Sequence, residues 1–263
     1  MTTATLTRPG PPADAYRALG AYQTLCSAVP DTEVCVDLTS GEVDAGLLRI
    51  LRAARVRVDV PDVATAQVCL DGGLRPADLV LADARAGREE LATLVALEVR
   101  STVVRDVSGV IRLAAACADA EAGDAGFTGA TDAAVLAEVT GRCGAEAEDA
   151  VDALLLADQL GLTPLGVRVP LTWADPGVWV QELTTARAVL SELLTFRVAP
   201  HVLDLGSGFP VLSEQEPDVW RQGRLLRGAL TTVFGTRPPR TAVSSTLPPA
   251  ILGSVTWFGT AVG

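Results

Sequence analysis

The chain has 263 residues, of which 49% are apolar and 20% charged, a composition that allows one large hydrophobic core. Its formal net charge is −11 and no basic block interrupts it, so binding to nucleic acid or to an anionic membrane surface is disfavoured. Segment 1–12 is polar and lacks the apolar stretch of a signal peptide, and no apolar run approaches the length of a membrane span. We therefore expect a cytoplasmic protein without nucleic-acid or membrane partners.

The basic residues are unusual, because all 21 of them are arginine and the sequence contains no lysine. A Schiff base on a lysine side chain is therefore excluded within this chain. Five scattered cysteines without a C-x-x-C pair indicate reduced buried thiols. With a single histidine beside them, we expect no metal site.

Strands and helices alternate along most of the chain. Residues 1–30 are predicted to form an N-terminal extension with one helix at 14–28. The predicted strands are short and mostly apolar, and they lie at 34–38, 56–60, 78–82, 102–105, 121–129, 165–169, 202–205 and 241–244. The helices that follow the first seven strands are predicted at 43–54, 62–70, 88–97, 107–118, 146–161, 175–194 and 217–234.

Eight strand–helix units with apolar strands favour a closed parallel barrel over an open sheet. We therefore predict an α/β fold, a (β/α)8 TIM-like barrel, over residues 31–248. Residues 249–263 form an apolar tail that contains Trp257 and Phe258. This tail is predicted either to close the barrel of a monomer or to need a second surface to cover it.

The most informative motif lies at residues 201–210, which read HVLDLGSGFP. An apolar strand carrying Asp204 runs into Gly206, Ser207 and Gly208, whose backbone N–H groups can approach a phosphate or carboxylate. A plain turn is the alternative interpretation of this loop. Barrel active sites lie in the loops after the strands. Further candidate ligand-binding residues at such positions are Thr39, Ser40 and Thr172.

Candidate catalytic groups are the strand-end acids Asp37, Asp59 and Asp204, together with His201. Two acids with different pKa values can perform acid–base chemistry, although strand-end acids also anchor loops and a histidine before a strand is often structural. Convergence of Asp59 and Asp204 in one open pocket would favour an enzyme. Filling of that pocket by side chains would argue against one.

Segment 203–210 (LDLGSGFP) resembles the L-D-[IL]-G-G-G-F-P signature of the fold-type III pyridoxal-phosphate decarboxylases, the ornithine/diaminopimelate/arginine decarboxylase family. Segments 51–62, 81–91, 141–144 and 165–176 are similar, in order, to further stretches of that family, so the resemblance spans roughly residues 32–246. It implies a barrel of the alanine racemase/ornithine decarboxylase type. We expect this protein to lack the family's C-terminal β-domain and its C-D-G-x-D segment.

Three departures from the family concern its cofactor. The Y-A-V-K lysine should fall near 38–40, where residues 37–40 read D-L-T-S. The histidine that stacks on the pyridine ring should fall near Pro170, and the E-P-G-R segment near 243–249 reads VSSTLPP here. Without the lysine, the cofactor cannot form an internal aldimine with the chain. Without the acid beside the ring nitrogen, the pyridine ring of the cofactor is a weaker electron sink. We therefore predict that pyridoxal phosphate is not a cofactor.

Two functions follow from this combination. The first is a decarboxylase-like pseudoenzyme that binds a small phosphorylated or carboxylated ligand, or acts as a regulator through a homodimer or another partner. The second is a pyridoxal-phosphate-independent enzyme of a specialised biosynthetic pathway. It would use strand-end carboxylates in a cyclisation or an elimination.

Overall fold

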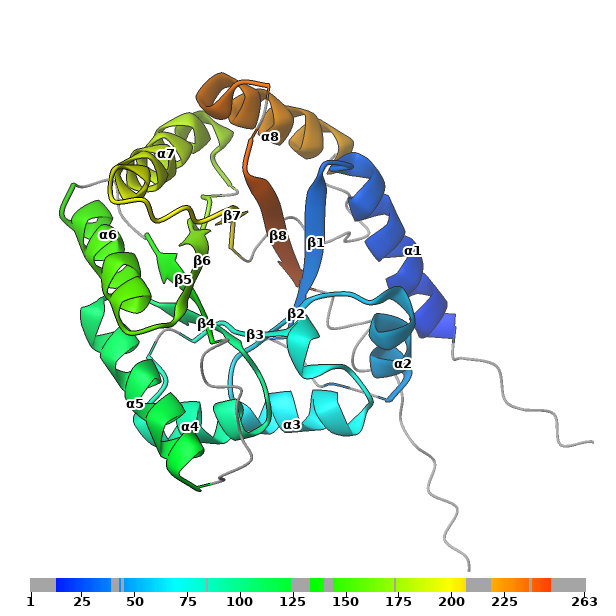
Figure 1. The fold of residues 1–263 in the computed structure, drawn as a ribbon. Coiled ribbons are helices and arrows are strands. Elements are labelled where there is room, and N and C mark those ends of the chain that lie inside the picture. The colour runs from blue at the N-terminus through cyan, green and yellow to red at the C-terminus, as the bar shows by residue number, and fades with distance from the viewer. Residues whose placement is uncertain are drawn as a thin grey trace, which may run out of the picture.

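The computed structural model describes residues 13–38, 43, 45–83, 85–123, 133–139, 144–172, 174–206, 219–236 and 238–246. Parallel strands β1 to β8 close into a barrel in chain order, with β8 pairing back onto β1, and the helices form a ring outside it (Figure 1). The predicted (β/α)8 barrel is confirmed. None of the described helices is long and apolar enough to cross a membrane.

The strands are β1 (Thr32–Asp37), β2 (Val58–Val60), β3 (Leu79–Leu81), β4 (Ser101–Val104), β5 (Ala134–Glu138), β6 (Thr163–Arg168), β7 (Val202–Asp204) and β8 (Arg240–Thr246). The helices are α1 (Ala13–Ala28), α2 (Ala45–Ala54), α3 (Val63–Asp71), α4 (Arg88–Ala96), α5 (Val107–Gly123), α6 (Gly144–Gln159), α7 (Trp179–Thr195) and α8 (Val219–Phe234). Short 3-10 turns precede β3 and α7, at Pro76–Asp78 and Pro176–Val178.

The fifth predicted strand is wrong. Residues 121–123 belong to α5, residues 124–129 lie outside the described part, and the fifth strand is Ala134–Glu138. Residues 121–123 continue α5 because alanine has a high helix propensity. The A-V-L-A-E run forms the strand because it is apolar enough to be buried between its neighbours β4 and β6.

Successive side chains of each strand alternate between the helices and the barrel interior. The large core between strands and helices is built from one set of alternate residues, such as Val58 and Val60 of β2. A separate small apolar cluster is formed by Val80, Val103, Leu136 and Val202, which come from β3, β4, β5 and β7. The barrel interior also contains charged side chains of β2, β6 and β7, namely Asp59, Arg168 and Asp204.

Helices α1 and α8 approach closely at Gly223. A Cβ atom on this buried residue would overlap the carbonyl oxygen of Ala28 at the end of α1. Gly228, one and a half turns further along α8, is exposed, and a Cβ there would meet no atom within 4 Å. The two glycines of one helix therefore have different reasons for being there.

We predict that Gly223→Ala lowers the free energy of unfolding by about 1–3 kcal/mol, because α8 must move away from α1. Gly228→Ala should raise it by about 0.5–1 kcal/mol through helix propensity alone. Urea unfolding of the two variants measures both. Equal effects of the two substitutions would contradict this packing.

Candidate functional site

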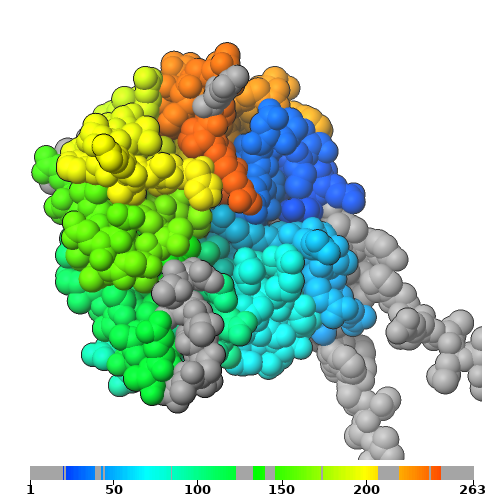
Figure 2. Space-filling view, in the orientation of Figure 1, coloured from blue at the N-terminus to red at the C-terminus, as the bar shows by residue number. Residues whose placement is uncertain are grey.

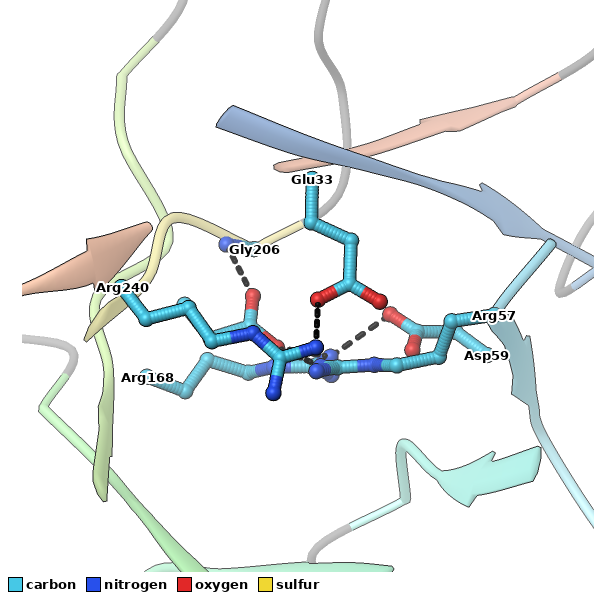
Figure 3. A network of polar contacts seen from close by, with 7 residues as sticks. Glu33, Arg57, Asp59, Arg168, Gly206 and Arg240 are labelled. Atoms are coloured by element: carbon cyan, nitrogen blue, oxygen red, sulfur yellow. Dashed lines mark hydrogen bonds and ion pairs between the residues drawn. The ribbon is translucent and has the colours of Figure 1, made fainter. Parts of the chain in front are cut away.

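A buried ion network crosses the barrel interior from β6 to β2 and β7 (Figure 3). Arg168, at the end of β6, donates from Nη2 to Oδ2 of Asp59 at 2.6 Å and to Oδ2 of Asp204 at 2.9 Å. Arg57, directly before β2, donates from Nη2 to the same Asp204 oxygen at 2.8 Å. Figure 3 shows the two arginine side chains extended toward each other. Two carboxylates and two guanidinium groups therefore balance in charge.

Strand alternation explains why these four side chains meet. Val58 and Val60 pack against the helices, so Arg57 and Asp59 face inward. Arg168 lies opposite Asp204 in the register of β6 and β7, which makes them neighbours on the interior face. The side chains of Arg168, Asp59 and Asp204 are 5%, 1% and 0% exposed, so the carboxylates face packed protein.

The electrostatics of Asp204 are set by its partners. Burial alone would raise the pKa of this carboxyl, but the guanidinium groups of Arg168 and Arg57, with the N–H of Gly206, hold the pKa below its usual range. Burial likewise opposes the charge of Arg168, yet Asp204 and Asp59 outweigh that cost and raise the guanidinium pKa. Asp204 is therefore an ionised, ion-paired group at neutral pH.

The described part of the glycine loop is engaged within the chain. The N–H of Gly206 donates to Oδ1 of Asp204 at 2.8 Å. Gly206 has a φ of +71°, and a Cβ there would lie 2.7 Å from the Cα of Pro170. The turn and the approach to Pro170 thus account for this glycine without a ligand. Ser207 and Gly208 lie outside the described residues.

The other candidate residues differ in their placement. Asp37 is buried at the end of β1, in register with Asp59. Thr172 is exposed, and its hydroxyl donates to Oε1 of Glu182 on α7 at 2.6 Å. His201 is exposed and precedes β7, at the other end of that strand from Asp204. The structure therefore brings Asp59 and Asp204 together but not His201, and Thr39 and Ser40 fall outside its described part.

Sequence reasoning missed Arg57 and Arg168. A signal was present, because each is a charged residue that alternates with valines in an apolar strand, as in V-R-V-D-V (56–60) and G-V-R-V (166–169). Such a pattern indicates an inward-facing charge that needs a buried partner. Among the residues that the structure describes, no cluster of His, Cys, Asp and Glu is suited to hold a metal ion.

No protein-family model and no curated protein sequence matches this chain. Solved structures do match. Lysine decarboxylase from Selenomonas ruminantium superposes with a TM-score of 0.73 at 18% identity, covering 88% of this chain and 59% of that one. Ornithine decarboxylase from Entamoeba histolytica gives 0.69 at 15% identity, over 88% and 62%. The arginine decarboxylase of Paramecium bursaria Chlorella virus gives 0.71 at 12% identity, over 88% and 62%.

The chain therefore spans about 60% of the length of these decarboxylase chains. Two of the matching lysine decarboxylase structures contain pyridoxal phosphate, one of them with cadaverine. At these low identities the likeness concerns the fold. The resemblance inferred from the sequence is confirmed at that level: this chain has the barrel fold found in the lysine, ornithine and arginine decarboxylases.

Proposed function

We propose that this protein is a decarboxylase-like barrel that has lost pyridoxal-phosphate chemistry and acts by binding a ligand or a partner. The observation that carries the proposal is the ion network of Arg57, Asp59, Arg168 and Asp204, which fills the barrel interior near the strand ends. This is the region in which barrel enzymes place their reacting groups.

The residues present do not fit the cofactor. An internal aldimine needs a lysine, and none occurs among the 263 residues. The described N–H of the glycine loop, that of Gly206, already donates to Asp204. The single histidine stands before β7 rather than near Pro170, where the family's stacking histidine was expected.

The alternative, cofactor-independent acid–base catalysis, has one point in its favour, because Asp59 and Asp204 do converge. They converge on Arg168, however, with side-chain exposures of 1% and 0%, so no open space separates them for a substrate. A carboxylate whose pKa is held low is also a weak base, and a good general base has a pKa near the working pH. The binding role is therefore favoured.

Ligand or partner binding belongs, in this proposal, to the loops that follow the strands. Ser207, Gly208, Thr39 and Ser40 stay candidates for a phosphorylated or carboxylated ligand there. A second copy of the chain or another protein is the alternative occupant of these loops. The ion network would provide a fixed base beneath either one.

We expect Arg168→Met to lower the free energy of unfolding by about 3–5 kcal/mol, because two buried carboxylates lose their shared cation. Adding Asp59→Asn to that variant should restore part of the loss, since one stranded charge is removed. Arg88→Met is the matched control, because Arg88 pairs with Asp119 on the exposed surface and should matter far less. Denaturant unfolding of the three variants gives the comparison. A small loss of stability in Arg168→Met would refute a network held by Arg168. A double variant less stable than Arg168→Met alone would refute it as well.

The depressed pKa of Asp204 predicts acid sensitivity. A carboxyl with a lowered folded pKa contributes stability that is full above its unfolded pKa, about 3.9, and is lost as pH falls through the folded value. The stability difference between the protein and its Asp204→Asn variant should therefore be constant near neutral pH and shrink below about pH 4. Unfolding curves between pH 2 and 7 would show this. A difference that grows on acidification would have the wrong sign for an ion-paired Asp204.

Loss of Schiff-base chemistry is tested by borohydride trapping with pyridoxal phosphate, followed by peptide mass mapping. We expect no pyridoxyl group on any side chain, only on the α-amino group. Arg75→Lys, at an exposed pair with Asp78, is the control that shows a side-chain amine being trapped. A stoichiometric, dialysis-resistant pyridoxal phosphate, or decarboxylation of lysine, ornithine or arginine, would overturn the proposed function.

A further inference from the structure

A hollow of about 510 Å³ lies where helices α7 and α8 meet the residues that lead into β7 and β8. On the face seen in Figure 2, the yellow segment that leaves α7 lies beside the orange segment that enters β8. The polar lining comes from Arg187 and Ser191 of α7, from His201 and from Arg240. This hollow lies at the opposite end of β7 from Asp204, so the ion network does not account for it.

The charge of the hollow differs from that of the molecule. The chain carries a net charge of −11, yet the lining holds two arginines and a histidine. Among the described residues the lining itself includes no carboxylate, although Glu33, which is not part of it, pairs with Arg240. The neighbouring cavity of about 590 Å³ shares the wall of Pro238, Pro239 and Arg240 but includes Asp31. Complementarity of charge therefore favours an anion in the 510 Å³ hollow.

Both arginines are held in place by one bond each. Nη1 of Arg187 donates to the carbonyl of Val233 at 2.6 Å. This carbonyl lies in the last turn of α8, where the helix dipole is negative. Nη2 of Arg240 donates to Oε2 of Glu33 at 2.7 Å. Within the described ranges, the remaining guanidinium nitrogens of these two residues have no other partner. They are thus positioned donors available to a ligand.

The rest of the lining is apolar. Leu190, Leu194 and Phe234 line it together with three prolines, and Leu194 is 60% exposed. A ligand with an apolar body would cover this surface. The volume lies within the range of about 300–1,000 Å³ that is typical of small-molecule sites.

We propose that this hollow binds a small organic anion, a carboxylate or phosphate monoester attached to an aromatic or aliphatic body. Arg187 and Arg240 bind the anionic group, His201 and Ser191 add hydrogen bonds, and the leucines and Phe234 contact the apolar body. The site goes beyond the proposed function and does not depend on it, because it uses no residue of the ion network and none of the glycine loop.

The single histidine makes the test specific, since its Hε1 proton gives one resonance in the ¹H NMR spectrum and His201 lines the hollow. Phenyl phosphate and benzoate are titrated as probes, with benzyl alcohol and inorganic phosphate as comparisons that lack the charge or the apolar body. We expect a saturable shift with one or both aromatic anions, and the stronger of the two identifies the preferred anionic group. Both comparison compounds should bind more weakly.

Arg187→Gln and Arg240→Gln should each weaken binding of the better probe by about tenfold or more, since a charge-assisted hydrogen bond is lost. Arg75→Gln, which makes the same change in charge away from the hollow, should leave the affinity unchanged. If Arg187→Gln fails to fold because its bond to Val233 is lost, Arg240→Gln decides the question, since its side chain is 61% exposed. No saturable shift at millimolar probe, equal binding of benzyl alcohol, or full affinity in Arg240→Gln would overturn the proposal.

Discussion

The contact of Arg168 with both Asp59 and Asp204 determines what the interior of this barrel can hold. Two carboxylates are buried together there because a guanidinium with fixed donors lies between them and Arg57 pairs with one of them from the other side. Buried charges without such partners are costly, so these side chains are bound to one another rather than to a ligand. The space in which barrel enzymes work is used here for a structural contact.

The two ends of β7 consequently differ in character. At its carboxyl end, Asp204 binds Arg57, Arg168 and the N–H of Gly206, and these partners satisfy its charge inside the chain. At its amino end, a cationic and apolar hollow remains open to solvent around His201. Under the proposed function, this chain keeps the barrel fold of the decarboxylases while its chemistry and its binding surfaces differ from theirs.

Much of the fold was predictable because strand and helix patterns are local. Prediction failed at the fifth strand. The Ala-rich end of α5 gives no clear signal of where the helix ends, and the strand A-V-L-A-E lacks a clear alternation of apolar and polar residues. The ion network is a different case. Its partners lie 36, 109 and 147 residues apart, and only closure of the ring brings them together. Asp59 and Asp204 were identified as strand-end acids, but the sequence could not show that Arg168 separates them.

The central claim is that this decarboxylase-like barrel functions without pyridoxal phosphate. Native mass spectrometry of the protein purified from its own host tests it most directly. The account predicts a mass that contains no pyridoxal phosphate, with the chain either holding a different small molecule or bound to another subunit. Pyridoxal phosphate at full occupancy in that spectrum would contradict the account, because the cofactor would then bind without a lysine and beside a filled interior.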